Sequence, residues 1–304
     1  MSLEPDAPSP RRIRWGRWLA GGLALVALAV AVVLIARWLR GLDAVQAFLV
    51  TFPGSYPLPD GAPVGFPAWL GWQHFFNAFL LVLVVRTGLQ ARAEKRPEVL
   101  WTSRRNRRRR MSLTVWTHLA LDALWIVNGI LYAVLLFATG QWLRIVPSDW
   151  AVIPNALSAA LQYASLDWPL ENSWVNYNAL QQLSYFTTVF VAAPLAIVTG
   201  ARMSALWPRG AERLNRVYRF ELAKAVHLPV MVYFVVFTIV HLALVLATGA
   251  LRNLNHIFAA RDAGDWVGFA IFVIALLAIA GGWALVRPAI AERIAHAFGE
   301  VSRR

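Results

Sequence analysis

The sequence predicts an all-α integral membrane protein, and two observations carry that prediction. Of its 304 residues, 59% are hydrophobic and 15% are charged, whereas about a quarter of the residues of a soluble domain are charged. The apolar residues fall in runs of roughly 18 or more with few charges, which is the length needed to cross a bilayer. The 15 tryptophans fit the same class, because indole favours the membrane–water interface.

Six runs are expected to be transmembrane helices. The first follows the basic segment RRIRWGRW and lacks a small-residue cleavage site, so we expect a retained helix and not a signal peptide. The second starts after Pro67, and the third follows a run of arginines. Glycines end the third, fourth and fifth, and the sixth precedes AIAERIAHAF, which indicates a surface helix. The predicted spans are residues 17–39, 67–90, 113–139, 178–200, 225–249 and 266–287.

The basic residues predict the orientation of these spans. Of the 29 Lys and Arg residues, 24 fall on the side that holds both termini and the connections after the second and fourth spans. The positive-inside rule therefore places both termini in the cytoplasm. Membrane topology and contact with anionic lipid account for the net charge of +13, so we expect membrane lipid and no nucleic acid as a partner.

The chain divides into four predicted parts. Residues 1–16 form a disordered basic N-terminus, and residues 17–66 form an extra transmembrane helix with its outer loop. Residues 67–250 form a four-helix core, and residues 251–304 form a last transmembrane helix with a basic tail. Within the core, residues 141–177 are expected either to lie along the interface as an amphipathic segment or to cover the bundle.

Four of the six histidines lie inside the predicted spans, where ionisable side chains are rare and usually functional. His227 and His241 are 14 residues apart on one span, which corresponds to about 21 Å and close to four helical turns. Consecutive spans alternate in direction. His118 therefore lies at the depth of His227, and His74 lies at the depth of His241.

The paired histidines predict two haem sites in a central four-helix bundle. Imidazole is the usual axial ligand of haem iron, whereas zinc normally requires three or four protein ligands. The absence of cysteine excludes c-type haem attachment and cysteine-ligated iron–sulfur clusters. We expect His74 with His241 to bind one haem, and His118 with His227 to bind the other. His256 and His296 are expected to be solvated bystanders.

Four segments in order carry a family resemblance: GWQHFFNAFLLVLVVRTGLQ, THLALDALWIVNGILYAVLLFATGQWLRIVP, YNALQQLSYFTTVFVAAPLAIVTG and HLPVMVYFVVFTIVHLALVLATG. At these residues the chain resembles the bacterial di-haem cytochrome b family, which includes the b-type subunits of nickel–iron hydrogenases, formate dehydrogenase and thiosulfate reductase. The resemblance implies two haem b groups held by the four histidines. It also implies electron transport in a respiratory chain of the bacterial plasma membrane, between the quinone pool and a peripheral catalytic oxidoreductase subunit of molybdopterin or hydrogenase-like type.

Two alternatives stay open. A stand-alone transmembrane reductase of cytochrome b561 type would use the same haems without a partner subunit. A haem-free membrane transporter or scaffold would use the histidines for packing or for proton transfer. In none of these interpretations is a soluble-substrate catalytic residue predicted in this chain.

A few polar residues near the histidines are candidates for a supporting role. Asp122 lies one turn from His118. It is expected to relay protons for quinone, to bond a polar neighbour such as Asn128, Asn178 or Gln182, or to turn outward towards the headgroups. Arg86 is expected to contact a haem propionate or the headgroups. Gln181 and Tyr185 either line a quinone pocket or pack the helices. Phe234, midway between the two ligands of its span, is expected to fill the gap between the haems.

Overall fold

The computed structural model describes residues 15–168, 172–205, 207–208 and 210–304, so the predicted disordered segment lies almost wholly outside the described residues. The prediction of an all-α membrane protein is confirmed. Six helices are long and apolar enough to cross a membrane, and each overlaps one predicted span. These spans are Leu19–Arg40, Ala68–Ala93, Leu113–Ala138, Ala179–Met203, Phe220–Ala247 and Val267–Leu285.

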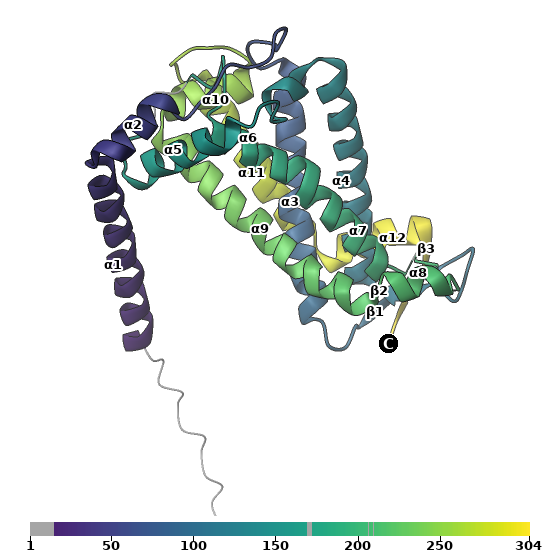
Figure 1. The fold of residues 1–304 in the computed structure, drawn as a ribbon. Helices are drawn as coiled ribbons and strands as arrows, with labels where there is room; N and C mark the ends of the chain where they lie inside the picture. The colour runs from purple at the N-terminus through teal and green to yellow at the C-terminus, as the bar shows by residue number, and fades with distance from the viewer. Residues whose placement is uncertain (1–14, 169–171, 206, 209) are drawn as a thin grey trace, which may run out of the picture.

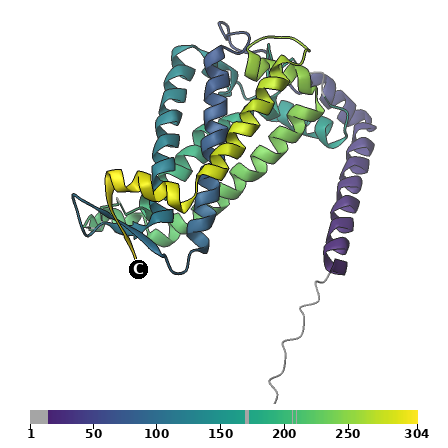
Figure 2. The same cartoon turned by 180° about the vertical axis from the view of Figure 1, so that it is seen from behind.

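Four of these spans form the centre of the molecule (Figure 1). Helix α3 (Ala68–Ala93) packs along α4 (Leu113–Ala138), while α9 (Phe220–Ala247) packs along the fourth span. That fourth span consists of α6 (Ala179–Phe186), the π-helix η2 (Thr187–Ala192) and α7 (Ala193–Met203). Helix α11 (Val267–Leu285) packs on α3 and is seen from behind in Figure 2. The histidine-bearing helices α3, α4 and α9 therefore all belong to this centre.

Local signals begin two of the core helices. The Ser112 side chain accepts a hydrogen bond from the Val115 amide at the start of α4. At the start of α6, Asn178 and Gln181 form a reciprocal capping box. Such caps satisfy backbone N–H groups that have no partner within the helix.

Helix α1 (Trp15–Arg40) stands apart from the bundle (Figure 1). It contacts the remainder of the chain near one end, where Arg37 Nε donates to the Ser165 carbonyl at 3.0 Å and Arg40 Nη1 donates to Ser165 Oγ at 2.7 Å. Most of its large apolar side chains are exposed. A bilayer is the environment that suits such a surface, because lipid chains are as apolar as the side chains.

One end of the bundle is covered by short helices, and we call it the outer end. These helices are α2 (Asp43–Thr51), the 3-10 helix η1 (Gln141–Arg144), α5 (Val152–Ala164) and α10 (Ala250–Ala259). Helix α5 combines the two expectations for residues 141–177. Ala156 and Ala159 are buried, whereas Ile153 and Leu157 are exposed, so one face covers the bundle and an apolar face remains free, as in an interfacial helix.

The opposite, inner end carries a small sheet that the sequence analysis did not predict. Strand β1 (Val99–Ser103) lies between β2 (Arg110–Ser112) and β3 (Gly299–Arg303), and both pairings are antiparallel. Helix α12 (Pro288–Phe298) confirms the predicted surface helix, and α8 (Glu212–Val217) lies at the same end. Trp101 packs with Leu113 and Ala295 in a core between sheet and helices. A side chain at Gly299 would collide with the Trp101 ring, so the crossing of β3 over this ring requires glycine.

Candidate functional site

The structure brings His74 of α3 and His241 of α9 together at the depth that helix parity predicts. Their ring centroids are 6.0 Å apart, with 59° between the ring planes. Aromatic rings surround the pair. Phe237 stacks on His241 at 5.5 Å, Tyr185 meets the same imidazole edge-on at 5.9 Å, and Phe258 meets His74 edge-on at 6.1 Å. We call His74 and His241 the outer pair.

The spacing of the outer pair fits two ligands of one metal ion. A bond between a metal and an imidazole nitrogen measures about 2.0–2.1 Å, and the ring centre lies ~1 Å beyond that nitrogen, so two imidazoles on opposite sides of one metal have centroids about 6 Å apart. The observed 6.0 Å agrees with this geometry. Two imidazoles that hydrogen-bond to each other directly, or that stack, have ring centres closer together than this.

His118 of α4 and His227 of α9 form the inner pair, which is matched in depth and within electrostatic range. A buried threonine supports each imidazole. Thr87 Oγ1 lies 3.1 Å from His118 Nδ1, and Thr199 Oγ1 lies 2.8 Å from His227 Nδ1. The two threonines sit on the helices that pack beside each histidine, α3 and α7.

The hydrogen bonds of these threonines favour one tautomer of each imidazole. Each hydroxyl donates its single hydrogen to a backbone carbonyl one turn earlier, at 2.8 Å to Leu83 for Thr87 and at 2.6 Å to Leu195 for Thr199. The hydroxyl oxygen is then left to accept a hydrogen bond from Nδ1–H. Nε2 therefore keeps its lone pair, and this neutral tautomer is the one that binds a metal through Nε2.

Glycine follows each of these threonines and gives the imidazole room. A Cβ atom at Gly88 would lie 3.1 Å from His118 Cε1, and one at Gly200 would lie 3.5 Å from His227 Cε1. From the sequence, Gly200 is expected only to end the fourth span. The signal that marks the site is a repeated Thr-Gly dipeptide at the inner ends of the second and fourth spans.

Asp122 lies beside the inner pair. Its Oδ2 atom is 3.5 Å from His118 Nε2, which is longer than a good hydrogen bond. Of the suggested polar neighbours, Asn178 bonds Tyr163 and Gln182 bonds Tyr56, while Asn128 Nδ2 has no hydrogen-bond partner among the described residues. The carboxyl group therefore faces the imidazole nitrogen that is free to bind a metal or a proton.

Of the other predicted residues, one contacts a candidate ligand and two hold the helices in place. Arg86 donates to the Trp283 carbonyl and lies over the Trp283 ring at 4.7 Å, so it ties α3 to α11. Gln181 belongs to the capping box of α6. Tyr185 alone of these three touches a candidate ligand, because its ring packs on His241.

Phe234 lies between the two pairs, as expected for a spacer. It is 5% exposed and meets the Trp125 ring of α4 edge-on at 5.9 Å. It packs against Ala192, the last residue of the π-helix. Pro194 follows two residues later, and a proline inside a span removes a backbone hydrogen bond, which accounts for the wider turn.

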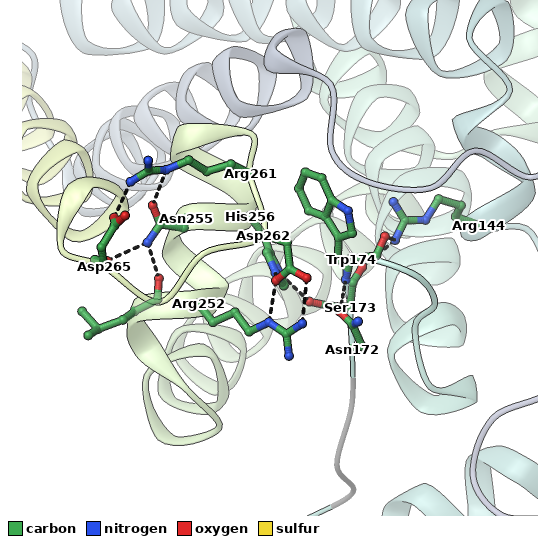
Figure 3. Close-up of polar contacts among 11 residues, drawn as sticks. Arg144, Asn172, Ser173, Trp174, Arg252, Asn255, His256, Arg261, Asp262 and Asp265 are labelled. Carbon is green, nitrogen blue, oxygen red and sulfur yellow. Dashed lines mark hydrogen bonds and ion pairs between the residues drawn. The ribbon is translucent and has the colours of Figure 1, made fainter.

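His256 is buried and hydrogen-bonded, so the prediction that it is solvated is wrong. It is 2% exposed, its Nε2 atom lies 2.8 Å from Asp262 Oδ1, and its Nδ1 atom lies 3.0 Å from Ser173 Oγ (Figure 3). Burial lowers the pKa of His256, against the opposing effect of the carboxylate. Hydrogen bonds from Arg252 and His256 hold the pKa of Asp262 well below its usual range. His296 is exposed, as predicted.

No known protein family, curated protein or solved structure matches this chain. Among the described residues, no group of three or more His, Cys, Asp or Glu side chains is arranged to hold a metal ion. Site assignment therefore depends on the geometry of the two histidine pairs. That geometry fits a cofactor that brings four ligands of its own and leaves two axial positions to the protein.

Proposed function

We propose that this chain is a di-haem b-type cytochrome, with one haem between His74 and His241 and the other between His118 and His227. The single observation that carries the proposal is the 6.0 Å separation of the outer imidazoles at matched depth. The tautomer that the threonines favour at the inner pair supports it independently. A haem bound at either site would supply a one-electron carrier, and the chain supplies its axial ligands, its burial and the hydrogen bonds that tune it.

Two haems at these depths favour electron transfer across the membrane. The ligands on α9 are 14 residues apart, so the sites are separated by about 21 Å along the helix. We propose quinone as the redox substrate and a peripheral oxidoreductase subunit, of molybdopterin or hydrogenase-like type, as the partner in a bacterial plasma membrane. The cluster of basic residues at the inner end supports a cytoplasmic location for both termini.

The test is a dithionite-reduced minus oxidised spectrum of the purified, haem-replete protein. The proposal predicts a b-type α-band with two haems per chain. A haem-replete preparation without that band would overturn the proposal. Pull-down of a molybdopterin or hydrogenase-like subunit would support the anchor role, whereas substrate reduction by the isolated chain would favour the stand-alone cytochrome b561-type reductase.

One observation favours a candidate from another class. Asp122 lies 3.5 Å from His118 Nε2 inside a span, and an acid beside a histidine is an arrangement suited to proton transfer in a haem-free transporter. The candidates differ in what His118→Ala does. It removes a haem band if the chain is a cytochrome, and it changes only proton-coupled flux in proteoliposomes if the chain is a transporter.

A further inference from the structure

Arg144 is a buried cation that has no acidic partner among the described residues. It is 1% exposed, and its Nη atoms donate to carbonyl oxygens of Gly65 at 2.6 Å and of Ser173 at 2.5 Å. Its guanidinium lies over the ring of Phe66 at 4.9 Å and over that of Tyr177 at 4.8 Å. Its Nε–H group is buried and has no acceptor. A buried charged donor without an acceptor favours the binding of a ligand that supplies an acceptor.

Two other buried donors, one on α3 and one on α4, also lack an acceptor within the described part of the chain. The indole N–H of Trp69 and the amide of Asn128 are buried and unpartnered. Tyr132 meets the Trp69 ring edge-on at 6.2 Å and lies one turn from Asn128 on α4. Tyr132 also interacts electrostatically with Tyr177. Trp69 and Asn128 share one property with Arg144, which is a buried N–H without an acceptor.

This group of donors adjoins the outer histidines. The Tyr177 ring meets the Tyr185 ring edge-on at 5.0 Å, and the Tyr185 ring in turn meets His241 at 5.9 Å. Burial raises the pKa of Tyr177, and the charge of Arg144 opposes that effect. Tyr177 therefore stays a neutral donor. The partner that suits these donors is an acceptor, and the guanidinium of Arg144, whose Nε–H has none, binds an anionic acceptor most strongly.

We propose that Arg144 binds the carboxylate groups of the haem held by the outer pair, assisted by Trp69 and the neighbouring tyrosines. Haem b carries two propionate carboxylates, and a guanidinium is well suited to bind a carboxylate. The inference rests on the proposed function. Arg86 lies next to Thr87, at the inner pair, and is engaged by Trp283, so it takes no part in this outer contact.

The test compares haem b with its dimethyl ester, in which both carboxylates are neutral. The double variant His118→Ala/His227→Ala provides a protein with the outer site alone. Apo-protein in detergent micelles is titrated with each haem, and affinity is read from the Soret absorbance. This protein should bind haem b at least about tenfold more tightly than the ester, since a hydrogen bond to a charged group contributes that much.

Arg144→Met in this background should bring the affinity ratio close to one, by weakening haem b and sparing the ester. Retained ester binding shows that the variant is folded. Arg86→Met is the matched control and should keep the full ratio. Trp69→Phe keeps an aromatic ring and removes the indole N–H donor, so it should lower the ratio in part even if Arg144→Met does not fold.

Each outcome decides something different. Equal affinity for haem b and ester in the outer-site protein would overturn this inference, and the proposed function would stand. A ratio that Arg144→Met leaves unchanged, with the protein folded, would also overturn it. A protein that binds neither form would instead contradict the proposed function.

Discussion

The most specific prediction concerns the two threonines of the inner pair. Thr87→Val and Thr199→Val keep the side-chain shape but remove the oxygen that accepts from Nδ1–H, at 3.1 Å in His118 and 2.8 Å in His227. Both threonines are at most 2% exposed, so water has little access to take the place of the lost hydroxyl oxygen. A buried donor without an acceptor costs about 1–3 kcal/mol, which corresponds to about five- to 150-fold in affinity for the inner haem.

The assay is haem titration of the apo-protein, with the inner site isolated by His74→Ala/His241→Ala. Thr238→Val is the control, because Thr238 makes the same bond to a backbone carbonyl, at 2.8 Å to Phe234, and among the described residues has no hydrogen bond to a histidine. Each supporting-threonine variant should weaken haem binding within that range, and the control should not. Unchanged affinity in both variants would refute the tautomer argument.

Three further predictions follow from single contacts. Gly88→Ala should lower inner-haem affinity, because its Cβ would lie 3.1 Å from the His118 ring. Gly200→Ala should not, because its Cβ would lie at an ordinary contact distance of 3.5 Å from the His227 ring; equal effects on haem titration would contradict this. Burial lowers the pKa of His256 below its ordinary value of 6.5, so just below pH 6.5 the unfolded chain binds more protons than the folded chain. The melting temperature should therefore fall as the pH is lowered through this range, and it should fall less steeply in His256→Gln. Deletion of β3 should speed tryptic cleavage of the arginine-rich β1–β2 turn and leave the haem spectrum unchanged, since this strand covers one edge of β1; unchanged cleavage would show that the strand gives no protection.

The spans and the depth of each histidine could be predicted because a bilayer constrains the sequence directly. A span must be apolar and near twenty residues long, so the predicted and observed helices overlap throughout. Alternating direction then places His74 at the level of His241 without any knowledge of packing. The ligand roles of these residues stay predictions.

The supporting residues were missed because their roles depend on packing between distant segments. Thr87 and Thr199 read as ordinary polar residues at helix ends, and only the pairing of α3 with α4 and of α7 with α9 brings them to the imidazoles. Arg144 and His256 read as loop residues, and they become buried only when the 173–177 segment folds over them.

The small sheet could not be predicted for a similar reason. Strand β2 is three residues long and begins in an arginine run, and β3 (Gly299–Arg303) lies nearly 200 residues from β1 (Val99–Ser103) along the chain. Neither strand has an alternating pattern long enough to indicate a strand by itself. Their pairing depends on the Trp101 core and on the path of α12 across the inner end.

Haem stoichiometry in paired histidine variants tests the central claim most directly. The account predicts two haems per chain in the native protein and one in His74→Ala, in His241→Ala and in the double variant of both, because these two residues share a haem. It predicts no haem in His74→Ala/His118→Ala. One haem retained in that last variant, or none in His74→Ala/His241→Ala, would contradict the pairing on which the proposed function depends.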